Sequence, residues 1–151
     1  MYNDTITLFN HYVSDNVDVW YPSVLRNVNV ITDNAAIIAK YGAGSTDKAI
    51  LNVRYCPLNG NKMIGDKIWI PPKEWANQSE EMLHKSITFA TGNISDFFVV
   101  GEWKSVDPVS DDTYGIDGFY NYTNSNYDYV FSITSVGGPY TVIPHFEITG
   151  K

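Results

Sequence analysis

The sequence predicts a mainly β fold: a single domain over residues 1–151, built as an antiparallel β-barrel or sandwich with one short helix and a long acidic loop. Three observations support this prediction. Apolar and polar residues alternate with period two in several segments, as the two faces of a strand require. Aromatic residues, which favour strands, make up 15% of the chain. Turn-forming Asn, Asp and Gly residues separate the alternating segments.

The C-terminal part of the chain carries the strongest strand signal. Residues 127–134 alternate between apolar and polar side chains, and residues 140–149 repeat the pattern. Gly137 and Gly138 lie between the two segments, and glycine readily adopts the positive φ of a tight turn. The pattern therefore predicts a β-hairpin that turns at these two glycines.

The rest of the chain contains shorter strand-like segments separated by turns such as Asp15-Asn16. Pro22 cannot donate to a sheet ladder, so we place it at a strand start, an edge or a bulge. Residues 56–67, rich in Asn and Gly, read as a loop. The predicted strands are residues 5–13, 17–32 (as one or two strands), 35–41, 48–55, 67–70, 87–90 and 97–103.

One segment, residues 73–86, is compatible with a helix. Ser79 is placed to cap its N-terminus, and Glu80 and Glu81 would follow in the first turn, near the positive end of the helix dipole. Residues 104–126 are acidic and rich in Tyr, without clear periodicity. They predict a long exposed loop, with a short strand at 119–122 as an open alternative.

Charge and hydropathy limit the classes of partner. The net charge is −7 and no cluster of Lys and Arg occurs, which argues against direct nucleic-acid binding. DNA is expected at most to pass through a channel lined by the protein. No apolar run approaches the ~20 residues that span a bilayer, so we expect no membrane partner. The start of the chain does not resemble a signal peptide, and Cys56 is the only cysteine, so a reducing cytoplasm is expected.

No metal or cofactor is expected. The histidines His11, His84 and His145 and the thiol of Cys56 fall in different predicted elements without the spacing of zinc ligands. A calcium-binding loop is the alternative, since carboxylates in a flexible segment suit that ion. A solvated acidic loop is the simpler interpretation. The carboxylates concerned are Asp107, Asp111, Asp112 and Asp117.

The residues also predict no enzyme. Glu102 and Glu147 would need to lie close together to act as a glycosidase pair, and nothing in the sequence brings them together. Ser132 and Ser135 lie across the predicted hairpin from His145, but no nucleophile elbow surrounds either serine. The glycine-containing residues 42–46 lack the Lys-Ser/Thr of a phosphate loop.

Aromatic and acidic side chains of the long loop suggest a contact surface, since exposed aromatics mark protein interfaces or sugar-stacking sites. A carbohydrate-binding module would use Tyr120, Tyr122, Tyr127 and Tyr129. The predicted interface residues are Trp75, Asp107, Asp111, Asp112, Tyr114, Phe119, Tyr120, Tyr122 and Tyr127.

The order of short motifs along the chain carries a family resemblance. ITLFN at residues 6–10 is followed by LRNVNV, IWIPPKEW, FFVVGEW, FSITSV and PHFEITGK. The chain resembles a family of small uncharacterised proteins encoded in the structural-gene modules of Firmicutes tailed phages and prophages. Its P-x-x-W motif falls at residues 72–75, and its final H-(aromatic)-x-V-x-G motif at residues 145–150, with Ile148 in place of Val. The G-D-x-x-x-x-G motif is degenerate, because Gly92 is offset from Asp96.

The resemblance implies a non-enzymatic virion structural protein, a subunit of a head–tail connector or neck ring of the head-completion, stopper or adaptor type. It implies a small β-barrel or sandwich that forms a homo-oligomeric ring and contacts virion proteins on the portal or adaptor side and on the tail side. Such a protein would be assembled in the bacterial host cytoplasm and reside in the virion. Another tail or minor capsid component, a carbohydrate-binding module and, least favoured, a hydrolase remain alternatives.

Overall fold

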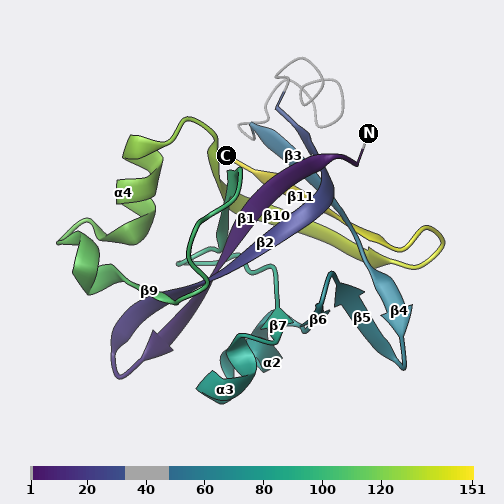
Figure 1. Ribbon diagram of the computed structural model, residues 1–151, viewed down its shortest axis with the longest axis horizontal. Helices are drawn as coiled ribbons and strands as arrows, with labels where there is room; N and C mark the ends of the chain where they lie inside the picture. The colour runs from purple at the N-terminus through teal and green to yellow at the C-terminus, as the bar shows by residue number, and fades with distance from the viewer. Residues whose placement is uncertain (1, 33–47) are drawn as a thin grey trace.

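The computed structural model describes residues 2–32 and 48–151 and has a closed antiparallel β-barrel at its centre (Figure 1). The strand predicted at 35–41 and the glycine segment at 42–46 lie outside the described residues. Neighbouring strands follow the order β1-β8-β10-β11-β3-β2, and β1 also pairs with β2, which closes the sheet on itself. The prediction of a mainly β fold is confirmed, in its barrel form. The barrel strands are β1 (Asp4–Ser14), β2 (Val17–Ile31), β3 (Ala49–Arg54), β8 (Phe97–Val100), β10 (Val130–Tyr140) and β11 (His145–Gly150).

Strands β1 and β2 form a long hairpin around the predicted turn. Asp15 and Asn16 have φ of 50° and 63°, as a two-residue hairpin turn requires. Strand β2 is continuous through Pro22. The part of β2 that pairs with β9 (Val109–Ser110) ends before this proline, and the part that pairs with β3 begins after it. Pro22 thus pairs with Phe9 of β1 in mid-strand, and the only edge-like feature is that no described strand pairs with it on the other side. A bulge follows at Asn27, with φ of 57°, where the register of β1 against β2 shifts by one residue.

The barrel interior holds the main core, and side-chain alternation decides which residues enter it. Ile6 and Leu8 of β1 and Phe98 of β8 point inward and are completely buried. Phe97 points outward, yet it is also completely buried because a helical segment covers that outer face. The run FFVV of β8 is therefore apolar on both faces, because one face lines the barrel interior and the other is covered by the helical segment.

The covering segment is the part of the chain that we predicted as a loop, and that prediction is wrong. It contains a 3-10 helix (Asp111–Tyr114) and the helix α4 (Gly118–Asn126), with no strand at 119–122. Phe119, completely buried, packs its ring 5.0 Å from the ring of Phe9. The helix depends on this tertiary packing, because its Asn, Tyr, Thr and Ser residues have only modest helix propensity.

A second, four-stranded sheet lies beside the barrel. It contains β4 (Cys56–Leu58), β5 (Asn61–Ile64), β6 (Lys67–Trp69) and β7 (Ser86–Ile87). The loop predicted at 56–67 is thus wrong. Asn59 and Gly60, with φ of 52° and 81°, form a tight hairpin turn between β4 and β5.

The single predicted helix at 73–86 is two short helices, α2 (Pro72–Ala76) and α3 (Glu80–Leu83). Ser79 does occupy the N-cap position of α3, but its side chain makes no capping hydrogen bond. Trp75 of α2 and Leu83 of α3 are buried together against Tyr21 of β2. Among the described residues, no helix has the length and apolar character needed to cross a membrane.

The C-terminal hairpin exists, but its turn lies farther along the chain than predicted. Strand β10 runs through Gly137 and Gly138, and the chain reverses at residues 141–144. The glycines serve an irregular stretch of the strand: Gly138 has φ of 103°, and a Cβ at Gly137 would lie 2.6 Å from the Tyr140 hydroxyl. The Gly-Gly pair therefore marks a bulge and a close side-chain approach instead of a turn.

Candidate functional site

The predicted interface residues differ in burial. Trp75 and Phe119 are 1% and 0% exposed, so the expectation that they lie on a contact surface is wrong for these two core residues. The others lie on residues 104–129, which we call the acidic lobe. They are half-buried or exposed: Asp107, Asp111, Asp112, Tyr114, Tyr120, Tyr122 and Tyr127.

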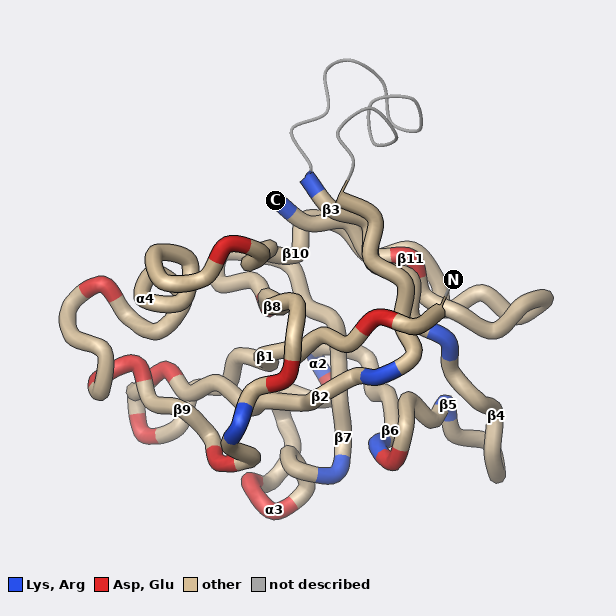
Figure 2. The backbone as a smooth tube through the Cα atoms, turned by 45° about the horizontal axis from the view of Figure 1, so that its top comes forward, with Lys and Arg blue, Asp and Glu red and all other residues tan. Residues whose placement is uncertain are grey.

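The acidic lobe gives the molecule an uneven charge distribution. No Lys or Arg occurs between residues 105 and 150. Figure 2 shows acidic positions gathered around α4 and β9, whereas most basic positions lie elsewhere, among them those at β3, β5 and β6. Asp18, on the β1–β2 hairpin, adds to the acidic side, where it lines an open hollow together with Asp112 and Ile116.

Asp111 attaches the acidic lobe to the barrel. One of its carboxylate oxygens accepts a hydrogen bond of 2.7 Å from Trp20 Nε1 and one of 3.0 Å from the backbone N–H of Phe119. Gly118, with φ of 82°, allows the close approach, since a Cβ there would lie 3.0 Å from the other carboxylate oxygen. Asp111 therefore has a structural role that its place in an acidic sequence does not reveal.

We expect Asp111→Ala to loosen the acidic lobe and to lower the free energy of unfolding by about 1–3 kcal/mol, because it leaves the Trp20 and Phe119 donors without their acceptor. Urea unfolding followed by tryptophan fluorescence measures this loss. Asp112→Ala is the matched control, since Asp112 is exposed and should change stability by less than about 0.5 kcal/mol. Equal effects of the two substitutions would contradict the assignment.

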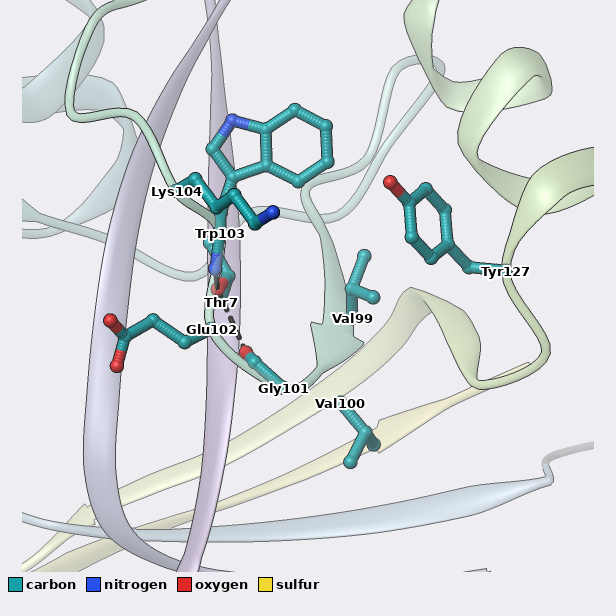
Figure 3. Close-up of a pocket in the computed structure, with 8 residues that line it drawn as sticks. All are labelled: Thr7, Val99, Val100, Gly101, Glu102, Trp103, Lys104 and Tyr127. Carbon is teal, nitrogen blue, oxygen red and sulfur yellow. Dashed lines mark hydrogen bonds between the residues drawn. The ribbon is translucent and has the colours of Figure 1, made fainter.

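A pocket of about 430 Å³ lies where the acidic lobe meets β8 (Figure 3). The rings of Trp103 and Tyr127 stand on either side of Val99, and their centroids are 6.2 Å apart. Thr7 fixes the backbone beneath: its hydroxyl donates to the Gly101 carbonyl at 2.9 Å and accepts from the Trp103 N–H at 2.9 Å. The pocket therefore presents the two aromatic rings above a backbone that the Thr7 hydrogen bonds hold in place.

The tyrosines proposed for sugar stacking do not form one platform. Tyr120 packs edge-on against Phe97, with ring centroids 5.0 Å apart, and burial raises the pKa of its phenol. Tyr122 packs against Tyr114 at 4.6 Å. Tyr127 alone among the four lines the pocket beside Trp103. A sugar-binding role would therefore centre on this last residue.

The candidate catalytic groups do not converge. Glu102 is paired with Arg26 and points away from Tyr127 (Figure 3), and Glu147 does not line the same pocket. The Ser135 hydroxyl is hydrogen-bonded to that of Thr149, whereas His145 lies farther along the hairpin, opposite Tyr140. These positions give neither the glycosidase pair nor a Ser-His pair.

The histidines occupy separate surroundings. His11 contacts the Asp18 carboxylate at 2.6 Å, His84 lies against the ring of Tyr21, and His145 Nδ1 lies 2.6 Å from the Ile143 carbonyl oxygen. Within residues 2–32 and 48–151, no group of three His, Cys, Asp or Glu side chains is arranged to hold a metal ion.

Asp96 is the one strongly shifted carboxylate among the described groups. It is 1% exposed and accepts three hydrogen bonds, from the backbone N–H groups of His11 (2.8 Å) and Ala90 (2.9 Å) and from Asn10 Nδ2 (2.8 Å). Burial raises its pKa to about 7, against the lowering effect of these three donors. Since it joins β1 to the segment before β8 and faces no pocket residue, we assign it to the structure of the barrel.

The tip of the β10–β11 hairpin exposes adjacent apolar side chains. Val142 is 96% exposed and Ile143 67%, with Tyr140 and Pro139 beside them. In Figure 1 this tip projects beyond the barrel. Our sequence interpretation missed it because it placed residues 140–149 within a strand. Two adjacent apolar residues followed by Pro144 were the available sign of a turn.

By fold, the protein is a small antiparallel β-barrel that carries a helical side lobe and a projecting apolar hairpin. The chain belongs to DUF6751, a family of unknown function, whose model matches residues 1–151. A search of curated proteins gave no match, and neither did a comparison with solved structures.

Proposed function

We propose that this protein is a non-enzymatic structural subunit of a tailed-phage virion, acting through protein–protein contacts in a ring at the head–tail connector. The observation that carries the proposal is the projecting hairpin tip. Exposed, adjacent apolar side chains at the end of a rigid element cost solubility and are typical of surfaces that are buried in an assembly. The placement in a phage neck rests on the motif resemblance.

Other features are compatible with this role. The closed barrel gives the hairpin a stiff base, since β11 is hydrogen-bonded to β3 as well as to β10. The Tyr55 hydroxyl donates to the Tyr140 carbonyl at 2.6 Å and so ties the projecting part to the barrel. A pre-ordered apolar tip loses little conformational entropy on binding, which favours assembly.

Cryo-electron microscopy of particles from the source strain tests the proposal. The expected result is a symmetric ring of this chain between portal and tail, with the hairpin tip against a neighbouring protein. Deletion of the gene should leave DNA-filled heads and free tails. Particles that lack the protein, or heads and tails that join normally without it, would overturn the proposal.

We expect Val142→Asp with Ile143→Asp to abolish incorporation into particles while leaving the fold intact. Both side chains are exposed, so their loss removes little core packing, whereas two charges at a buried contact would be strongly unfavourable. Particle proteomics measures incorporation and thermal unfolding measures the fold. Val106→Asp is the control and should incorporate normally, because Val106 is 79% exposed but lies away from the hairpin tip.

A carbohydrate-binding module is the second candidate, favoured by the pocket beside Trp103 and Tyr127. Aromatic faces and edges are common sugar contacts, and Glu102 and Lys104 at the rim could accept and donate hydrogen bonds. Binding on a glycan array that is lost in Tyr127→Ala would support this candidate.

A further inference from the structure

We propose that copies of this chain associate head to tail, with Ile116 and Asp117 of one copy entering a cation-rimmed pocket between β2, β3 and the β5–β6 turn of the next. The inference rests on the proposed function, because it names the surfaces that would build the ring.

The receiving pocket has a mixed polar and apolar lining and a basic rim. It encloses about 300 Å³, and Leu25, Val28, Val53 and Ile64 contribute to its lining. Arg26, Arg54 and Lys67 stand at its edge, and Asp66 supplies the single carboxylate among the lining residues. Since Glu102 pairs with Arg26, the rim keeps an excess of one positive charge in a protein whose net charge is −7.

The rim cations are held in place without being fully neutralised. The Arg54 guanidinium lies 3.8 Å from the ring centre of Tyr2, a contact that positions the group but leaves its charge intact. Lys67 Nζ donates at 2.7 Å to Ser23 Oγ, which is a neutral acceptor. Burial lowers the pKa of Lys67, and the neighbouring Asp66 carboxylate acts to raise it. Arg26 already pairs with Glu102. An incoming carboxylate would therefore pair best with Arg54 and Lys67.

The inserting segment has the complementary pattern. Ile116 is fully exposed, at 104% of the reference area, and lies at the tip of the acidic lobe. Asp117 follows it directly, and Asp112 lies nearby in the same hollow. The carboxylates beside Ile116 complement the basic rim of the pocket, and about 300 Å³ with some apolar side chains in the lining accommodates an isoleucine side chain.

The occupant is a second copy because one chain carries both surfaces and cannot join them itself. The acidic lobe lies at α4 and β9, whereas the pocket lies at β2, β3 and β5–β6 on the other side of the barrel (Figure 2). Each copy thus offers one donor and one acceptor surface. Such heterologous contacts generate rings or open filaments, in contrast to two-fold dimers.

A charge-swap experiment tests this contact by sedimentation velocity over a dilution series up to about 1 mM in low salt. Wild type should self-associate, and added salt should weaken the association. Asp112→Lys with Asp117→Lys makes both surfaces basic, and Arg54→Glu with Lys67→Glu makes both acidic. Each double variant should lose at least about tenfold in self-affinity. A mixture of the two should regain it, since each surface then meets its opposite.

Matched controls carry the same charge changes elsewhere. Glu74→Lys with Glu81→Lys, and Lys73→Glu with Lys85→Glu, alter exposed residues of the α2–α3 region and should associate like wild type. Ile116→Ala should weaken association, whereas Val106→Ala, another exposed apolar residue of the acidic lobe, should not. Wild type that stays monomeric throughout, or a mixture that fails to associate, would overturn the contact.

The failure of this contact and of the proposed function can be told apart in particles. If the protein forms a neck ring and both charge variants incorporate normally, the contact is wrong and the function stands. If head-to-tail association is observed in solution but particles lack the protein, the function is wrong and the contact stands.

Discussion

Asp96→Ala is expected to destabilise the barrel by several kcal/mol, enough to unfold much of the protein at 37 °C. The substitution removes the acceptor of three hydrogen bonds, from the backbone N–H groups of His11 and Ala90 and from Asn10 Nδ2, which keeps its bond to the Thr88 carbonyl, and each lost bond costs about 1–3 kcal/mol. The total stability of a domain is only about 5–15 kcal/mol. Urea unfolding at pH 5 measures the loss, and a change below about 1 kcal/mol would contradict the assigned role.

The same residue should make stability depend on pH. Its pKa in the fold is raised to about 7 from the ordinary value of 3.8, so the folded state holds a proton that the unfolded state releases. This contribution is fully present below about pH 4 and is lost as pH rises through about 7. With about 1.4 kcal/mol for each pKa unit, it amounts to roughly 4 kcal/mol.

Asp96→Asn is the control for this pH effect, because it keeps the shape of the side chain and cannot titrate. Its free energy of unfolding, measured between pH 4 and 8, should change less than that of wild type. The free energy of unfolding of wild type should fall relative to that of the variant as pH rises through about 7. Parallel curves would show that other groups cause the pH dependence.

Phe119→Ala is expected to lower the free energy of unfolding by about 3–5 kcal/mol, a typical loss for a fully buried phenylalanine. Its ring lies within 5.8 Å, centroid to centroid, of those of Phe9, Phe97, Trp103 and Tyr114. Removing the ring should detach α4 from β8 and expose Trp103, seen as a red shift of tryptophan emission together with an earlier urea midpoint.

Tyr122→Ala is the control on the same helix, since this residue is 41% exposed. It should cost no more than about 1 kcal/mol, because its ring packs mainly against Tyr114 on the surface. Equal losses from the two substitutions would mean that α4 is held by its own helix propensity and not by the Phe119 contact.

Much of the barrel could be predicted from the sequence because its strands are regular. The alternation in β1, β3 and β11 and the Asp15-Asn16 turn lie where local pattern and tertiary structure agree. The hairpin turn at residues 141–144 could not be placed, because Gly137-Gly138 gives a stronger local turn signal than the true turn. Only the close approach of Tyr140 explains those glycines.

The acidic lobe could not be predicted for a different reason. Its helix has weak local propensity and forms because β8 presents a second apolar face, which no window of the sequence reveals. The sequence did identify Asp112 and Tyr122 as exposed candidates for contact. It could not show that Asp111 is a structural acceptor or that Phe119 belongs to the core. Asp111 accepts from Trp20 and Phe119 packs against Phe9, and each partner lies about 90 or more residues away in the sequence.

The place of β11 in the barrel also decides when the barrel can close. This strand lies between β10 and β3, so the ring of strands stays open until residues 145–150 have been synthesised. During translation the earlier strands would expose edges that invite mispairing. Closure by a late strand removes those edges and orders the projecting tip in the same step. A nascent or truncated chain would therefore lack both the closed barrel and the ordered tip on which the proposed assembly role depends.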